Sequence, residues 1–103
     1  MSSQLATPMN EYEFVYILQP GLDDEGIQAA IDRLDSVITG AEGEVVSTER
    51  WGSRKLAYPI KRFFEGYYVL QQLSMPAAAT HVLERTLRIN EDVLRHMLLR
   101  ADK

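Results

Sequence analysis

The spacing of apolar residues changes period along this chain, and this change limits the folds open to it. From Glu11 to Gln19, aromatic and apolar residues fall at every second position, which predicts a strand with one buried face. Asp23 then begins a helix as its N-cap, and Gly40 and Gly43 are expected to end it. The apolar residues of this helix recur at helical spacing: Ile27, Ala30, Ile31, Leu34 and Ile38.

The same two patterns return in the rest of the chain. Glu44–Ile60 predicts a long strand with a bulge or bend at Trp51-Gly52. Pro59 cannot donate a ladder hydrogen bond, so this strand is expected at a sheet edge. The remaining elements are a turn over Lys61–Gly66, a strand over Tyr67–Met75, a helix from Pro76 to Asn90 that buries Val82, Leu83, Thr86 and Leu87, and a strand over Val93–Arg100.

This order of elements, β-α-β-β-α-β, predicts an α+β fold. With right-handed crossovers it gives the ferredoxin-like sandwich, in which two helices cover one face of a four-stranded antiparallel sheet. The opposite face of the sheet then stays open. An uncovered face with apolar and aromatic groups favours a binding partner.

The length of 103 residues suits one domain, which we assign to residues 10–103. Residues 1–9 are predicted to be a flexible leader, because they lack the basic and apolar regions of a signal peptide. No apolar run approaches the roughly 20 residues that span a bilayer, so no membrane partner is expected. The absence of cysteine excludes disulfides and thiol chemistry and favours an intracellular protein.

Charge is distributed unevenly, although the net charge is −4. Residues 1–49 hold ten acids and one base, whereas residues 50–103 hold ten bases and five acids. Such asymmetry suggests a polyanion partner for one face. The alternative, that the two halves intermix in space and their charges average out, remains open at this point.

Little in the chain could support catalysis, so no enzyme activity and no cofactor are expected. His81 and His96 are isolated and have no cysteine to complete a metal site. Asp23, Asp24 and Glu25 are better explained as residues that begin a helix than as a catalytic pair. Phosphate loops, dinucleotide fingerprints, nucleophile elbows and zinc spacings do not occur.

The segment RWGSRKLAYPIKRFF, Arg50–Phe64, contains five bases, no acid and four interleaved aromatic residues. RNA recognition uses this mixture, since cations neutralise phosphates while aromatic and arginine planes stack on unpaired bases. Lys61 and Arg62 are expected at a hairpin tip, where a phosphate can approach. The alternative is an edge strand that its charges protect against aggregation.

Three stretches of the sequence resemble one family. WGSRKLAYPIKRFFEGYYVL closely resembles the signature of the sixth protein of the bacterial small ribosomal subunit, the S-six family. NEYEFVYILQPGLDDEGI resembles that family's first strand and helix start, and LRINEDVLRHMLLR resembles its last helix end and last strand. The resemblance extends from Met9 to Arg100.

The resemblance implies a structural protein of the cytoplasmic ribosome with the ferredoxin-like fold. It would bind the central domain of the small-subunit ribosomal RNA as a heterodimer with the eighteenth small-subunit protein. Several relatives carry a C-terminal tail that grips the partner, so here more of the contact is expected on the sheet and its edge. The candidate RNA-binding residues, from the resemblance and the basic segment together, are Tyr12, Arg54, Lys55, Tyr58, Lys61, Arg62 and Arg95.

Two other functions remain open on the same element order. An RNA-recognition-motif protein would bind single-stranded RNA, and Gly66-Tyr67-Tyr68-Val69 loosely echoes its aromatic signature, although Glu65 stands where a basic residue is expected. A phosphatase or metabolite-sensing domain would act on a small molecule. The phosphatase needs an arginine in the loop after the first strand, and residues 19–22 supply none. No small-molecule substrate is therefore expected.

Overall fold

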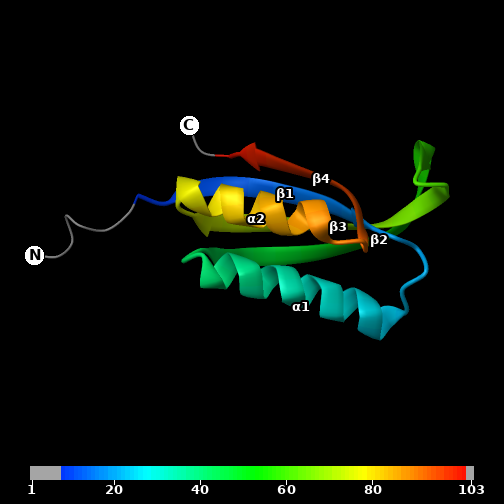
Figure 1. Cartoon of the computed structure of the whole chain (residues 1–103), viewed down its shortest axis with the longest axis horizontal. Helices are drawn as coiled ribbons and strands as arrows, with labels where there is room; N and C mark the ends of the chain where they lie inside the picture. Colours follow the sequence, from blue (N-terminus) through cyan, green and yellow to red (C-terminus); the bar gives the residue numbers. More distant parts are fainter. Residues whose placement is uncertain (1–7, 102–103) are drawn as a thin grey trace, which may run out of the picture.

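The structure, a computed structural model, describes residues 8–101, so most of the predicted leader (residues 1–9) lies outside the described residues. Figure 1 shows the two helices and four strands in the predicted order. The elements are β1 (Asn10–Leu18), α1 (Asp24–Gly40), β2 (Glu44–Ile60), β3 (Phe63–Met75), α2 (Ala77–Ile89) and β4 (Val93–Arg100).

The four strands form one antiparallel sheet in the order β2-β3-β1-β4. The ferredoxin-like fold is therefore confirmed. Strands β2 and β4 lie at the two edges, which also confirms the edge position predicted from Pro59. Within residues 8–101, no helix is long and apolar enough to cross a membrane.

One face of the sheet packs against both helices. The alternating residues of β1 point into this core, and Phe14, Tyr16 and Leu18 are completely buried. Helix α1 begins at the predicted N-cap, because the Asp23 side chain accepts a hydrogen bond from the Gly26 amide at 2.8 Å. The remaining core comes mainly from α1, β3 and α2: Ile27, Ala30, Ile31, Leu34, Ile38, Val69, Leu73, Met75, Ala79, Leu83 and Leu87.

The predicted buried stripe of α2 was partly wrong. Leu83 and Leu87 are buried as expected, but Val82 is exposed and Thr86 is half-buried. Ala79 takes the third inward position, because it lies four residues before Leu83 on the same helical face.

The predicted turn over Lys61–Gly66 was also wrong. Strand β3 begins at Phe63, so only Lys61 and Arg62 connect β2 to β3. Both residues have positive φ, 51° and 73°, which is the backbone of a tight two-residue hairpin turn. A loop this short brings Phe63 into register with Ile60.

Strand β2 is irregular near this turn. Its register against β3 shifts between Lys55, which lies opposite Glu65, and Ile60, which lies opposite Phe63. Residues 56–59 therefore face Phe64 alone, and a bulge of this size bends a strand. Figure 1 shows the end of the hairpin extending past the helices and turning away from the line of the sheet. We call residues 56–64 the hairpin tip.

Candidate nucleic-acid interface

The cations of the hairpin point to solvent. Lys55, Lys61 and Arg62 are exposed, and their side chains make no hydrogen bond or ion pair within residues 8–101. Figure 1 shows the end of the β2–β3 hairpin extending past the helices, and Lys61 and Arg62 form the turn at this end. Three such charges close together in the sequence form a site that attracts anions.

Aromatic side chains accompany these cations. Tyr58 is 60% exposed and Phe64 is 71% exposed, both on the hairpin tip. The Arg54 guanidinium lies 5.3 Å from the centre of the Trp51 ring, in cation–π geometry. Exposed aromatic faces and a stacked guanidinium are surfaces on which unpaired bases stack. Phe64 was not among the predicted site residues, although its position two residues after the turn could have indicated it.

Arg95 joins the hairpin tip from the far edge of the sheet. Its Nη1 donates a hydrogen bond to the Tyr58 hydroxyl at 3.1 Å. A cavity of about 120 Å³ lies beside this contact, lined in part by Ile17, Leu56 and Ala57. Leu56, Ala57 and Tyr58 share this lining, so the bulge has broken the side-to-side alternation that a regular strand would give. The bulge thus brings Tyr58 to Arg95.

Arg50 does not belong to this surface. Its Nη2 pairs with Asp24 Oδ1 at 2.6 Å, its Nη1 donates to Gln28, and its Nε donates to the Tyr67 hydroxyl at 3.0 Å. The hydrogen bonds to Tyr67 and Asp24 raise the pKa of Arg50 further above its ordinary value. Arg50 therefore ties β2 to α1 on the helix side of the sheet.

Tyr12 also lies apart from the other six predicted residues. Its side chain is in the core on the helix side and only 7% exposed, and its hydroxyl accepts a hydrogen bond from Asn10 Nδ2 at 3.3 Å. Such a side chain has little surface to offer an RNA. The structure places Arg54, Lys55, Tyr58, Lys61 and Arg62 on the β2–β3 hairpin and brings Arg95 of β4 to Tyr58, whereas Tyr12 lies in the core.

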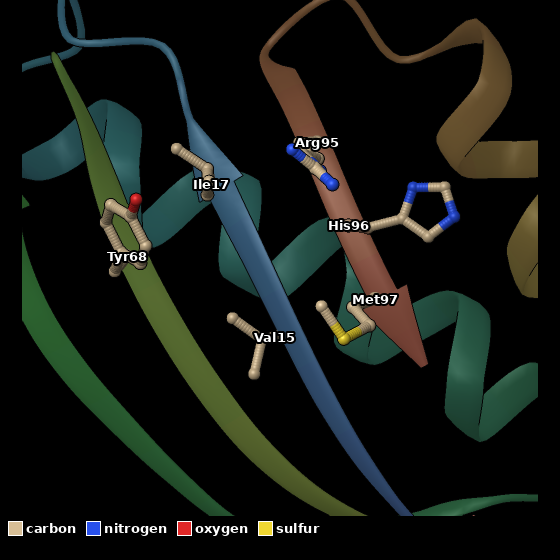
Figure 2. A pocket seen from close by; sticks show the side chains of 6 residues that line it. All are labelled: Val15, Ile17, Tyr68, Arg95, His96 and Met97. Carbon is tan, nitrogen blue, oxygen red and sulfur yellow. The ribbon is translucent and has the colours of Figure 1, made fainter. Parts of the chain in front are cut away.

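The open face of the sheet has an apolar hollow next to the hairpin tip. In Figure 2 the side chains of Val15, Ile17, Tyr68 and Met97 gather on the face opposite α1. The hollow has a volume of about 290 Å³ and also includes Arg95. His96, labelled in the same view, points toward α2 instead, where its Nε2 lies 2.9 Å from Glu84 Oε1.

This face differs from the surface of an RNA-recognition motif, which stacks bases on aromatic residues of its central strands. The central strand β1 presents the aliphatic Val15 and Ile17 there, and the hollow receives one aromatic ring from β3, that of Tyr68. The adjacent Tyr67 packs against the core and accepts the hydrogen bond from Arg50. Within the described residues, β1 thus supplies no aromatic ring to the hollow and β3 supplies one.

A polar cluster lies under the helix-covered face. Gln71 is fully buried, and its Nε2 donates to Asp35 Oδ1 at 2.8 Å and to Thr48 Oγ1 at 3.1 Å. Burial raises the pKa of Asp35, an effect that the Gln71 hydrogen bond opposes and the nearby Asp32 reinforces. Burial also raises the pKa of Tyr16 far above its usual range. These groups face the core, so the cluster is structural.

Metal ligands are not gathered anywhere in the described part of the chain: residues 8–101 contain no group of three or more His, Cys, Asp or Glu side chains that could hold an ion. The cavities that border the candidate interface lie on the open sheet face and at the hairpin, and the chemistry that these surfaces offer is contact through charge, stacking and apolar packing.

The fold and this surface together define a class of protein: a small ferredoxin-like protein with a cationic, aromatic hairpin beside an open sheet face. The model of the family described as Ribosomal protein S6 matches residues 11–100. Because this match covers most of the chain, the chain belongs to the ribosomal protein S6 family. It is therefore a small-subunit protein of the cytoplasmic ribosome.

Individual relatives agree with this assignment. Small ribosomal subunit protein bS6 of Desulforudis audaxviator is 43% identical over 94 residues, which cover 91% of this chain and 100% of that protein. The bS6 protein of Clostridium acetobutylicum is 42% identical over 95 residues, which cover 92% and 100%. The crystal structure of 30S ribosomal protein S6 from Thermotoga maritima is similar with a TM-score of 0.85 and 28% identity, covering 90% of this chain and 88% of that one.

Proposed function

We propose that this protein binds the central domain of the small-subunit ribosomal RNA together with the eighteenth small-subunit protein. The observation that carries the proposal is the hairpin of β2 and β3. It presents Lys55, Lys61 and Arg62 without partners among the described side chains, beside the exposed rings of Tyr58 and Phe64. Family membership supports the ribosomal setting of this contact.

The hairpin would contact mainly the phosphate backbone of the RNA. Lys55, Lys61 and Arg62 would neutralise phosphates and release counterions. Tyr58 and Phe64 would stack on bases that a folded junction leaves unpaired. Each phosphate contact lowers log K by about 0.7 to 0.9 per log unit of salt, so three contacts give a total slope of about −2 to −3.

The open-face hollow would receive the partner protein. It is lined mainly by apolar side chains, including Val15, Ile17 and Met97, and Met97 is 49% exposed. An apolar surface of this kind is stabilised when another chain covers it. The net charge of −4 works against RNA binding by this chain alone, so a basic partner would strengthen the joint surface.

Filter binding of a central-domain RNA fragment, with and without the eighteenth small-subunit protein, tests the proposal. We expect joint binding with a steep salt dependence. The variant Lys55→Gln, Lys61→Gln, Arg62→Gln should lose most of the affinity. A matched variant, Arg33→Gln, Arg85→Gln, Arg88→Gln, removes three charges from the helix layer and should bind like the wild type. No binding by the wild-type pair, or a flat salt dependence, would refute the proposal.

A further inference from the structure

The turn that joins β2 to β3 has a backbone that its residues disfavour. Lys61 and Arg62 both have left-handed φ values, 51° and 73°. Turns of this kind strongly prefer Asn-Gly, because glycine has no Cβ to clash and asparagine tolerates positive φ. In residues 8–101 the one other non-glycine residue with positive φ is Glu42, which is isolated and follows the end of α1. Two adjacent strained residues thus occur only at this turn of the described chain.

Contacts within the protein do not explain these side chains. Both Lys61 and Arg62 are exposed, and neither makes a hydrogen bond or ion pair with another described residue. They bury no apolar surface in the core either. Backbone strain persists only where the surrounding structure holds it in place, and strained residues cluster at functional sites.

The turn is nevertheless held at a fixed place. On one side, Arg95 holds Tyr58 through the 3.1 Å hydrogen bond. On the other, Ile60 pairs with Phe63 and packs beside the cavity of about 120 Å³ that Ile17 and Tyr68 also line. A rigid base positions the two cations before a ligand arrives, which lowers the entropy cost of binding.

We infer that the Lys61-Arg62 turn is a strained phosphate-binding tip, in which fold stability is given up so that two adjacent cations contact the RNA backbone. This inference rests on the proposed function, because it takes the ligand to be a strand of ribosomal RNA. It adds that the side chains of Lys61 and Arg62 do not suit the backbone of the turn, so the binding role can be separated from the folding role.

Two double variants separate these roles. Lys61→Asn, Arg62→Gly removes both the charges and the strain. Lys61→Gln, Arg62→Gln removes the same charges but leaves long side chains at positive φ. Thermal unfolding is measured for each protein alone, and filter binding is measured with the central-domain RNA fragment and the eighteenth small-subunit protein. Arg33→Gln, Arg85→Gln is the matched control, because it removes two exposed charges from the helix layer.

We expect the Asn-Gly variant to unfold several degrees higher than both the wild type and the Gln-Gln variant. Both turn variants should bind RNA more weakly than the wild type, on the order of tenfold, with a salt slope smaller by about 1.4 to 1.8. The control should match the wild type in affinity.

Equal melting temperatures for the Asn-Gly and Gln-Gln variants would overturn the inference, because the turn would then carry no strain. Wild-type RNA affinity in both turn variants would also overturn it, while binding by the wild type would leave the proposed function intact. Failure of the wild-type pair to bind RNA would refute both this inference and the proposed function.

Discussion

Arg95 of β4 donates a hydrogen bond to the hydroxyl of Tyr58 of β2, although these two strands lie at opposite edges of the sheet. Strands β3 and β1 separate them in the sheet order. The contact is possible because residues 56–59 form a bulge that bends the hairpin tip over the open face. It links the cationic tip to the hollow that Arg95 also lines.

Tyr58→Phe should loosen the hairpin tip without unfolding the protein. The change removes the hydroxyl that accepts from Arg95 and keeps the ring. A typical intramolecular hydrogen bond contributes about 0.5 to 1.5 kcal/mol, so RNA affinity should fall by at most about tenfold. Filter binding measures the affinity, and amide hydrogen exchange at residues 56–64 measures the loosening. Unchanged exchange at these amides would show that the bond does not hold the tip.

Local sequence rules predicted the elements well because they act over a few residues. The N-cap at Asp23 depends on one carboxylate and the next three residues. The edge position of β2 follows from Pro59 alone, since proline lacks the donor that an inner strand needs. The alternating residues of β1 likewise show which side is buried before any partner strand is known.

The candidate site was harder to predict because its geometry depends on register. Lysine and arginine at positive φ are uncommon, so nothing in the sequence indicated a two-residue turn at Lys61-Arg62. The length of the bulge opposite Phe64 is fixed only when β2 and β3 pair. Tyr58 therefore meets Arg95 through a relation that spans 37 residues and that no local pattern records.

Gly66→Ala should destabilise the fold. A Cβ at Gly66 would overlap Ile17 Cγ2 and lie 3.3 Å from the Leu18 carbonyl oxygen. Forcing an atom into such a contact costs about 1 to 3 kcal/mol. Urea denaturation measures the loss in the free energy of unfolding. Gly40→Ala is the control: its Cβ meets nothing within 4 Å, so alanine there should stabilise α1 by up to about 1 kcal/mol. Equal stability of the two variants would contradict the expected overlap.

Asp35→Asn should raise stability at neutral pH. Burial raises the pKa of Asp35 in the folded state, so the folded protein holds this proton at pH values where the unfolded chain has released it. The contribution of Asp35 to stability therefore falls as pH rises through the folded pKa. Asparagine removes the charge and can still accept the hydrogen bond from Gln71.

The advantage of Asp35→Asn should disappear near pH 4, about where the carboxyl group of the unfolded chain also becomes protonated. Urea unfolding of wild type and variant at both pH values measures it. Glu44→Gln, which removes an exposed carboxylate from β2, should show no comparable change between the two pH values. If the variant were less stable than the wild type at neutral pH, the hydrogen bond from Gln71 to the charged Asp35 would stabilise the fold more than burial of that charge destabilises it.

Arg50→Gln should leave RNA binding within about twofold of wild type, although Arg50 begins the basic segment. Its guanidinium is held on the helix side by Asp24 and Tyr67, so it does not face the proposed RNA surface. The Asp24 side chain is 85% exposed, and an exposed ion pair contributes only about 0 to 1 kcal/mol, so the variant should also fold normally.

Lys61→Gln is the matched comparison for Arg50→Gln, because each change removes one positive charge from the same hairpin. Filter binding at several salt concentrations should show a smaller salt slope for Lys61→Gln, by about 0.7 to 0.9, and an unchanged slope for Arg50→Gln. If the salt slope and the RNA affinity fell equally in both variants, binding would depend on the total charge of the segment. The direction in which each side chain points would then not decide binding, and the proposed surface would have to include the helix side of β2.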